Sequence, residues 1–379
     1  MRIGILSLPL HTNYGGILQA FALKTVLERN GHSVKIFCPT TPKIGLKYRL
    51  KLPYYYLKRI VSNLCGHKVP VFWEHKINAE RPKIRQHILR FINVNFDIVY
   101  VDDFRNIGDR EFDAIIVGSD QVWRPKYFES LYAAPITDAF LGFAEKWSIK
   151  RMAYAASFGV ANWEYSMRQT DKCRKLIKRF DAVSVREDSA VTLCSEKLSI
   201  KAELVLDPTM LLNAEDYISL LSNSQLSSKK NIIMTYILDN NEFIDEVVQI
   251  IKNRTGYPIY AHRPESSDIN DCIDKRILPS VEDWIDGVYQ SKMIITDSFH
   301  ACVFSILFHK PFLVIINDDR GATRFISLLK MFGLEDRIIN SVEAISDSLL
   351  VDPLPESVYT KLDEFRVKSY KFLDQLYDE

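Results

Sequence analysis

The residues best suited to chemistry lie near position 300, where Asp297, Ser298 and His300 follow the apolar run Met293–Thr296. This run is typical of a buried parallel strand, and the apolar pattern of 301–308 predicts that a helix follows it. Asp and Ser favour helix N-caps, so His300 is expected in the first turn of that helix, where ligands of open α/β sheets bind. A helix N-terminus disfavours a protonated imidazole, so His300 is a candidate neutral donor or acceptor. The alternative is a half-buried histidine bonded to a backbone carbonyl.

A second group of polar residues follows the apolar run Asp113–Val117, which predicts another buried strand. Gly118 allows a ligand to approach the backbone closely. Asp120 and Gln121 can hydrogen-bond the hydroxyls of a sugar, and Trp123 can stack on a sugar face. The structural alternative is that Asp120 only caps the turn that follows.

A cation stands at the end of a third expected strand, because Arg186 directly follows Ala182–Val185. A guanidinium at a strand end, close to a helix start, is well formed for a bidentate hold on a carboxylate or phosphate. The alternative is an ion pair with Glu187 or Asp188.

The chain opens with a strand, a loop containing a Gly pair, a helix and a second strand, over the ranges 2–8, 9–16, 17–30 and 33–38. This order predicts a βαβ unit with its loop at the carboxyl end of the first strand. The loop lacks the GxGxxG spacing, so no dinucleotide site is predicted. It could face a substrate or only form a tight turn into the helix.

Composition excludes several classes of protein. The net charge of +1 over 379 residues predicts no strong field toward nucleic acid. No apolar run reaches the roughly 18 residues of a membrane span, and the first residues do not have the pattern of a signal peptide. The six cysteines are scattered without a CxxC pair, so we expect reduced thiols, no metal site and a cytoplasmic location.

Residues 41–90 differ from the rest, with twelve Lys or Arg against the two acids Glu74 and Glu80 and with many aromatic residues between them. The pattern predicts an insertion of short helices. It could be a solvated amphipathic lobe, a contact with an anionic membrane surface or, least favoured because the whole chain is nearly neutral, a nucleic-acid site.

The chain resembles the polysaccharide pyruvyl transferase family over nearly its whole length. The resemblance is carried, in order, by Asn13-Tyr14-Gly15-Gly16, Gly118-Ser119-Asp120-Gln121-Val122-Trp123, Ser184-Val185-Arg186-Glu187, Leu206-Asp207-Pro208-Thr209 and the stretch from Ile294 to Ile316. No single motif is as specific as a Walker loop, but five in sequence rarely arise by chance.

Two βα-rich halves predict an α/β fold of two Rossmann-like domains facing a cleft, as in GT-B glycosyltransferases, and the resemblance implies the same fold. We expect an N-terminal domain at 1–206, a C-terminal domain at 207–354 and a helix at 355–379 that crosses back to the first domain. Because His300 and Arg324 belong to the C-terminal domain, we expect the donor to bind there, and the N-terminal loops at Tyr14–Gly16 and Asp120–Trp123 would then face the acceptor sugar.

The resemblance implies transfer of a pyruvyl group from phosphoenolpyruvate onto two hydroxyls of one sugar in a cell-surface polysaccharide or its precursor, free or lipid-linked. The product is a cyclic ketal, and no cofactor or metal is required. His300 would bind the donor and transfer a proton, and Asp120 or Asp207 would act as the base. Arg186 and Arg324 would bind the carboxylate or phosphate of the donor. Ser298, Gln121, Trp123 and the loop residues Tyr14, Gly15 and Gly16 complete the expected site.

One position departs from the family. Several members carry Arg two residues before the motif histidine, whereas this chain has Ser298. Without that cation, binding of the donor phosphate is weaker or depends on Arg320 or Arg324. Two alternatives therefore stay open: a nucleotide-sugar-dependent glycosyltransferase of the same fold and a sugar-binding homologue without catalysis.

Overall fold

The structure is a computed structural model that describes residues 1–40, 46–67, 69–222, 231–317 and 321–377, without the side chains of 46–49. The expected insertion at 41–90 therefore lies partly outside the described residues, and Arg320, an expected alternative for binding the phosphate, lies outside them. Within the described part, no helix combines the length and apolar character needed to cross a membrane.

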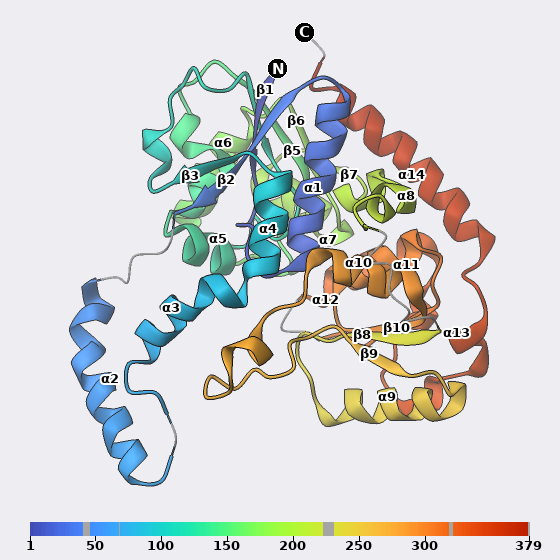
Figure 1. Cartoon of the computed structure of the whole chain (residues 1–379). Coiled ribbons are helices and arrows are strands. Elements are labelled where there is room, and N and C mark those ends of the chain that lie inside the picture. Colours follow the sequence, from blue (N-terminus) through green and yellow to red (C-terminus); the bar gives the residue numbers. More distant parts are fainter. Residues whose placement is uncertain (41–45, 68, 223–230, 318–320, 378–379) are drawn as a thin grey trace.

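The first half of the chain forms a seven-stranded sheet in the order β3-β2-β1-β4-β5-β6-β7 (Figure 1). Every neighbouring pair is parallel, so each connection must cross over the sheet, and helices cover both faces. The central strands are apolar and buried on both sides, as their sequences predict. The bounds are β1 (Arg2–Leu6), β2 (Ser33–Pro39), β3 (Ile98–Val101), β4 (Ala114–Val117), β5 (Lys150–Ala156), β6 (Ala182–Val185) and β7 (Glu203–Leu204).

Alternate residues of these strands enter two different cores. Ile3, Ile5 and Ile116 pack on one face with α1 and α4, while Leu6 and Val117 pack on the other with α5, α6 and α7. This period of two is what a strand with two covered faces requires. The helices of this half are α1 (Tyr14–Arg29), α2 (Leu46–Leu64), α3 (Trp73–Ile84), α4 (Gln86–Asn95), α5 (Pro125–Tyr132), α6 (Met167–Ile177) and α7 (Asp188–Leu193).

The second half forms a four-stranded parallel sheet in the order β11-β10-β8-β9. Its core is continuous with one face of the first sheet, and Tyr14 at the start of α1 stacks with Trp284 of α10. The elements are α8 (Ala214–Ile218), β8 (Ile232–Tyr236), α9 (Glu242–Thr255), β9 (Ile259–Ala261), α10 (Val281–Gln290), β10 (Ser291–Thr296), α11 (Phe299–Leu307), β11 (Phe312–Val314), α12 (Ala322–Phe332) and α13 (Asp347–Val351).

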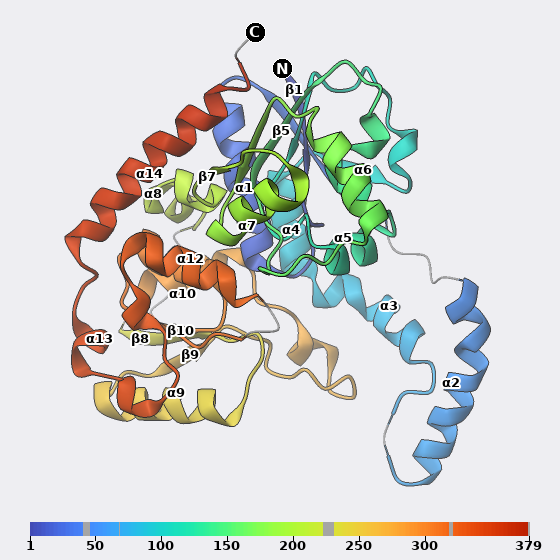
Figure 2. The ribbon, with the colours of Figure 1, turned by 180° about the vertical axis from the view of Figure 1, so that it is seen from behind.

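The last helix, α14 (Glu356–Asp374), runs from the second half back along the first (Figures 1 and 2). Its Ser369 hydroxyl accepts a hydrogen bond of 3.0 Å from the backbone N–H of Leu206, and Phe372 packs against Tyr154 of β5. The predicted fold class, two parallel α/β units with a C-terminal helix crossing back, is confirmed.

Candidate functional site

A cavity of about 250 Å³ lies where the carboxyl ends of strands from both sheets meet. The loops after β1 and β4 line it from the first half, and the loop after β10 and the start of α12 line it from the second. Its chemically active lining residues are His11, Asn13, Asp120, Gln121, Tyr127, Asp297, Ser298, His300 and Arg324. Five of the predicted site residues that could bind or react are thus brought together: Asp120, Gln121, Ser298, His300 and Arg324.

His300 lies in the first turn of α11, as the sequence predicts, and is buried. Gly15 in α1 makes this position possible, because a Cβ atom there would lie 2.2 Å from Cγ and Nδ1 of the imidazole. The Ser298 side chain does not make the expected capping bond, and the Asp297 carboxylate accepts the backbone N–H groups of Leu238 and Asp239 at 2.7 and 2.8 Å. Asp297 therefore fixes the loop after β8 against the helix start.

Arg186 lies behind the cavity and is engaged by two carboxylates. Its guanidinium donates to Asp207 Oδ2 at 2.5 Å, to Asp120 Oδ1 at 3.1 Å and to the Ser119 hydroxyl at 3.1 Å. The side chain is 1% exposed and does not line the cavity. In this structure Arg186 therefore binds the acids of the site, and the expected alternative of a pair with Glu187 is the longer contact, at 4.0 Å.

Asp207 connects Arg186 to His300. Its Oδ1 accepts the backbone N–H and the hydroxyl of Thr209, and its Oδ2 lies 3.6 Å from Nε2 of His300. Burial alone would raise the pKa of the Asp207 carboxyl, but His300 and the charge of Arg186 outweigh burial and hold it below its ordinary value.

Asp120 reaches the cavity through an unusual backbone conformation, with φ of 65°. Asp and Asn tolerate this left-handed region better than most residues, and such conformations cluster at functional sites. Oδ1 accepts the backbone N–H of Gln121 at 2.9 Å as well as Arg186. Burial would raise the pKa of Asp120, but Arg186, His300 and Arg324 together lower it, so the cavity holds a carboxylate at neutral pH.

Arg324 supplies the cation that lines the cavity. Burial lowers the pKa of its guanidinium to about 10, and the charge of Arg186 adds to the effect. Both guanidinium groups contact the ring of Phe299, whose centroid lies 4.6 Å from the guanidinium carbon of Arg186 and 5.5 Å from that of Arg324. A cation is attracted to an aromatic face, so these contacts offset part of the repulsion between the two guanidinium groups.

Besides Arg186 and Asp207, three predicted site residues do not line the cavity. Trp123 is fully buried, stacks on Phe140 and donates its indole N–H to Ala139, so its ring faces the core and not a sugar. Tyr14 packs into the second half and donates to the Pro279 carbonyl. Gly15 does not line the cavity itself, but its lack of a side chain leaves the space that the His300 imidazole occupies. Gly16 and Gln121 do line the cavity.

The sequence analysis gave Phe299 no place in the site and expected Asp297 to act as a helix cap. Phe299 immediately precedes the motif histidine, but apolar residues of a predicted helix are ordinarily assigned to the core. Among the described residues, no group of three or more His, Cys, Asp or Glu side chains is placed to hold a metal ion.

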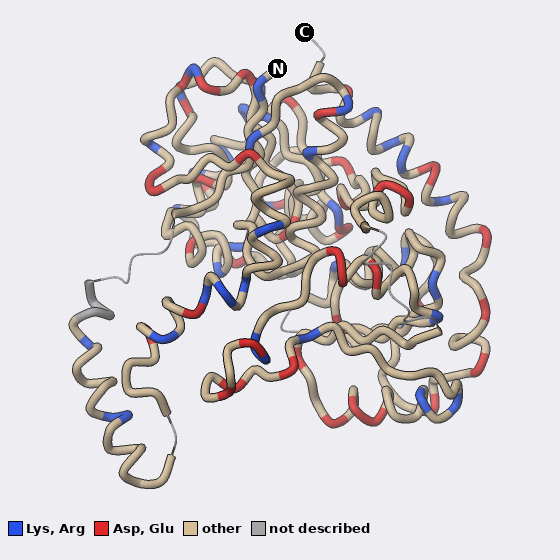
Figure 3. Tube along the Cα trace, viewed as in Figure 1, with Lys and Arg blue, Asp and Glu red and all other residues tan. Residues whose placement is uncertain are grey.

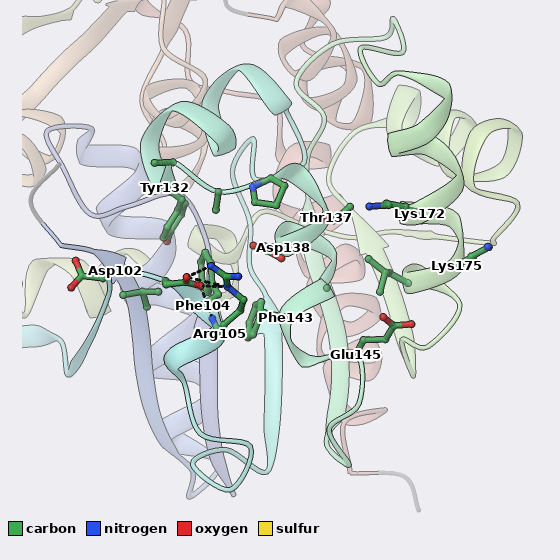
Figure 4. Close-up of a pocket in the computed structure, with 17 residues that line it drawn as sticks. Asp102, Phe104, Arg105, Tyr132, Thr137, Asp138, Phe143, Glu145, Lys172 and Lys175 are labelled. Carbon is green, nitrogen blue, oxygen red and sulfur yellow. Dashed lines mark hydrogen bonds and ion pairs between the residues drawn. The ribbon is translucent and has the colours of Figure 1, made fainter. Parts of the chain in front are cut away.

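A larger cavity, of about 820 Å³, lies elsewhere in the first half, between the turn after β3 and α6 (Figure 4). Lys172 and Lys175 of α6 stand on one side of it, and the Asp103–Arg105 ion pair stands on the other. Burial and the charge of Asp103 raise the pKa of Asp138 to about 6. None of the predicted site residues lies there.

Comparison with known families gives one match: a family model described as polysaccharide pyruvyl transferase covers residues 13–319. No curated protein gives a significant match. Similar solved structures include Arabidopsis thaliana UGT89C1 complexed with UDP-L-rhamnose (11% identity, 99% of this chain and 97% of that chain, TM-score 0.49). They also include S. aureus MnaA with UDP (11% identity, 99% and 91%, TM-score 0.48). At these TM-scores the likeness does not bear on the ligand or reaction of this chain.

Proposed function

The chain belongs to the polysaccharide pyruvyl transferase family, and from this premise we propose that it transfers the pyruvyl group of phosphoenolpyruvate onto two hydroxyls of one sugar. The observation that carries the proposal is the cavity in which His300, Arg324, Ser298 and Asp120 converge from both halves of the chain. The acceptor would be a sugar of a cell-surface polysaccharide, such as a capsule or exopolysaccharide, or of its precursor.

The donor requires groups that hold a carboxylate and a phosphate. Among the described residues, Arg324 is the guanidinium that lines the cavity, and the N-terminal turn of α11 adds backbone N–H groups. The Ser298 hydroxyl stands where several family members carry Arg. We therefore assign the cationic part of the donor site to Arg324, with Arg186 holding the neighbouring carboxylates in place.

The chemistry requires one proton at the methylene carbon of the donor and removal of protons from two hydroxyls. His300 would protonate that carbon, which makes C2 an oxocarbenium-like centre that the first hydroxyl attacks. Phosphate then leaves with the C–O bond electrons, and the second hydroxyl closes the ketal. One hydroxyl proton restores His300, and the other goes to phosphate.

Asp120 is the proposed first acceptor of one of these two hydroxyl protons during attack, and it then gives that proton up to His300 or to phosphate. Its low pKa makes it a weak base toward a free hydroxyl. A hydroxyl that has bonded to C2 is a far stronger acid, so an ionised carboxylate suffices at that point. The same carboxylate stabilises the positive charge that develops at C2.

The test is a thermal shift with millimolar phosphoenolpyruvate and, separately, with uridine diphosphate. A ligand that binds only the native state stabilises it by about 2.7 kcal/mol at a hundred times its dissociation constant. We expect protection by phosphoenolpyruvate in the wild type and in the control Arg105→Met, whose side chain is 82% exposed, but not in Arg324→Met. Protection by the nucleotide alone would overturn the donor assignment.

The role of His300 needs a separate readout. We expect His300→Ala to lose release of phosphate from phosphoenolpyruvate in the presence of the acceptor sugar. Turnover at the wild-type rate in this variant would exclude proton transfer by the imidazole and leave the cavity as a binding site only.

A further inference from the structure

Helices α2 and α3 form an arm that stands away from both sheets (Figures 1 and 2). The arm is anchored at the α3 end. Lys76 donates to the Ile269 carbonyl at 2.7 Å, and Glu80 pairs with Arg276 at 2.7 Å, so α3 is tied to the second half of the chain. Helix α2 is the outer part of the arm.

The inner face of α2 is fixed against α3. Arg59 donates through both terminal nitrogens to Glu74 at 2.7 Å, and the Tyr56 ring packs edge-on against Phe72. The Arg59–Glu74 pair is largely buried, with exposed fractions of 18% and 8%. These contacts set the rotation of α2 about its axis and therefore decide which side chains face outward.

The outer face of α2 is an apolar stripe. Its residues recur at intervals of four and three positions, which places them on one side of a helix. Each is more than half exposed in the described part of the chain, with exposed fractions from 52% to 83%: Leu50, Tyr54, Leu57, Val61 and Leu64. We name these five residues the outer stripe.

The charge around the outer stripe is positive. Helix α2 contains no Asp or Glu, as Figure 3 shows along its length, and the exposed Lys51 and Lys58 flank one edge of the stripe. Both acids of α3, Glu74 and Glu80, are already paired with arginines. The outer helix is therefore locally cationic in a chain whose net charge is only +1.

An apolar helical stripe can bind a second copy of the chain or a lipid bilayer, and the charges beside the stripe distinguish the two. A second copy of the chain would bring its own Lys51 and Lys58 to the same seam, and like charges beside a helical seam oppose pairing. An anionic bilayer offers apolar acyl chains to the stripe and negative head groups to the lysines. We propose that the outer stripe of α2 docks the protein on an anionic lipid surface, an inference that does not rest on the proposed reaction.

The test is co-sedimentation of the full chain with vesicles of phosphatidylcholine alone and of phosphatidylcholine with phosphatidylglycerol. We expect binding to the anionic vesicles, weakened by high salt. Each lysine near such a surface contributes roughly a fivefold change in partitioning, so Lys51→Glu with Lys58→Glu should lower binding by well over tenfold. Leu57→Glu with Val61→Glu should abolish it.

The matched control is Val367→Glu, which places the same charge at an apolar side chain that is 71% exposed on α14 and should leave binding unchanged. Two outcomes would overturn the proposal. One is no sedimentation with anionic vesicles at low salt. The other is a wild-type dimer, by light scattering, that Leu57→Glu with Val61→Glu converts to a monomer without any effect on vesicle binding.

Discussion

Replacement of Gly15 by Ala tests the placement of His300 with a single methyl group. The added Cβ would lie 2.2 Å from Cγ and Nδ1 of the imidazole, whereas carbon atoms in contact are separated by about 3.5 Å or more. The ring or the start of α1 must therefore move by roughly 1 Å. Such overpacking costs about 1–3 kcal/mol, against a gain of about 0.5–1 kcal/mol for Ala over Gly within a helix.

The effect on activity should exceed the effect on stability, because a displacement of about 1 Å in a reacting group can cost about a hundredfold in rate. We expect Gly15→Ala to unfold at slightly lower urea concentration and to lose phosphate release from phosphoenolpyruvate by about that factor. The neighbouring residue supplies the control. A Cβ at Gly16 lies 3.3 Å from Nδ2 of Asn13 and 3.4 Å from Oδ2 of Asp120, which small side-chain movements relieve.

Gly16→Ala should therefore keep most of the activity. If Gly15→Ala matched the wild type in both activity and urea midpoint, the imidazole could not lie against α1 as described. Equal losses in the two variants would instead point to the loop as a whole and not to the contact with His300.

Three further predictions concern the network and the contact between the halves. Arg186→Met leaves buried carboxylates without their cation and should cost about 3–5 kcal/mol in unfolding free energy, while Arg105→Met should leave the melting temperature unchanged. The pKa of the Asp207 carboxyl is lower in the folded state than in the unfolded state. The ionised carboxylate therefore stabilises the fold above about pH 4, and this contribution is lost as the pH falls. The free energy of unfolding, measured from pH 5 to 2, should decline less steeply in Asp207→Asn than in the wild type. Gly321→Ala places a Cβ 2.0 Å from the Gly159 carbonyl oxygen at φ of 96° and should lower the melting temperature by several degrees; an unchanged value would contradict this contact.

The site residues that come directly after a predicted strand could be identified from the sequence. Asp120, Ser298 and His300 converge because the carboxyl ends of parallel strands share one edge of each sheet, and the two sheets face each other there. Position along a strand does not determine which way an aromatic residue of the next loop turns. Trp123 turns into the core, where burial of its large apolar surface stabilises the loop.

The ion-pair partners of Arg186 could not be predicted from the residues next to it in the sequence. Its carboxylates lie 66 residues before it, at Asp120, and 21 residues after it, at Asp207, and only the folded chain brings them together. Strand β3 (Ile98–Val101) was not anticipated either. It is an edge strand with one buried residue, so its apolar pattern is too weak to separate it from a loop.

The contact of α14 with the first sheet has a consequence for the order in which the chain can fold. Domains generally fold as they leave the ribosome, N-terminal part first. The side of the first sheet that carries Tyr154 and Leu206 stays open until Ser369 and Phe372 have been made, because those residues cover it. The first half can therefore form its sheet early, but it becomes fully closed only after α14 has been made.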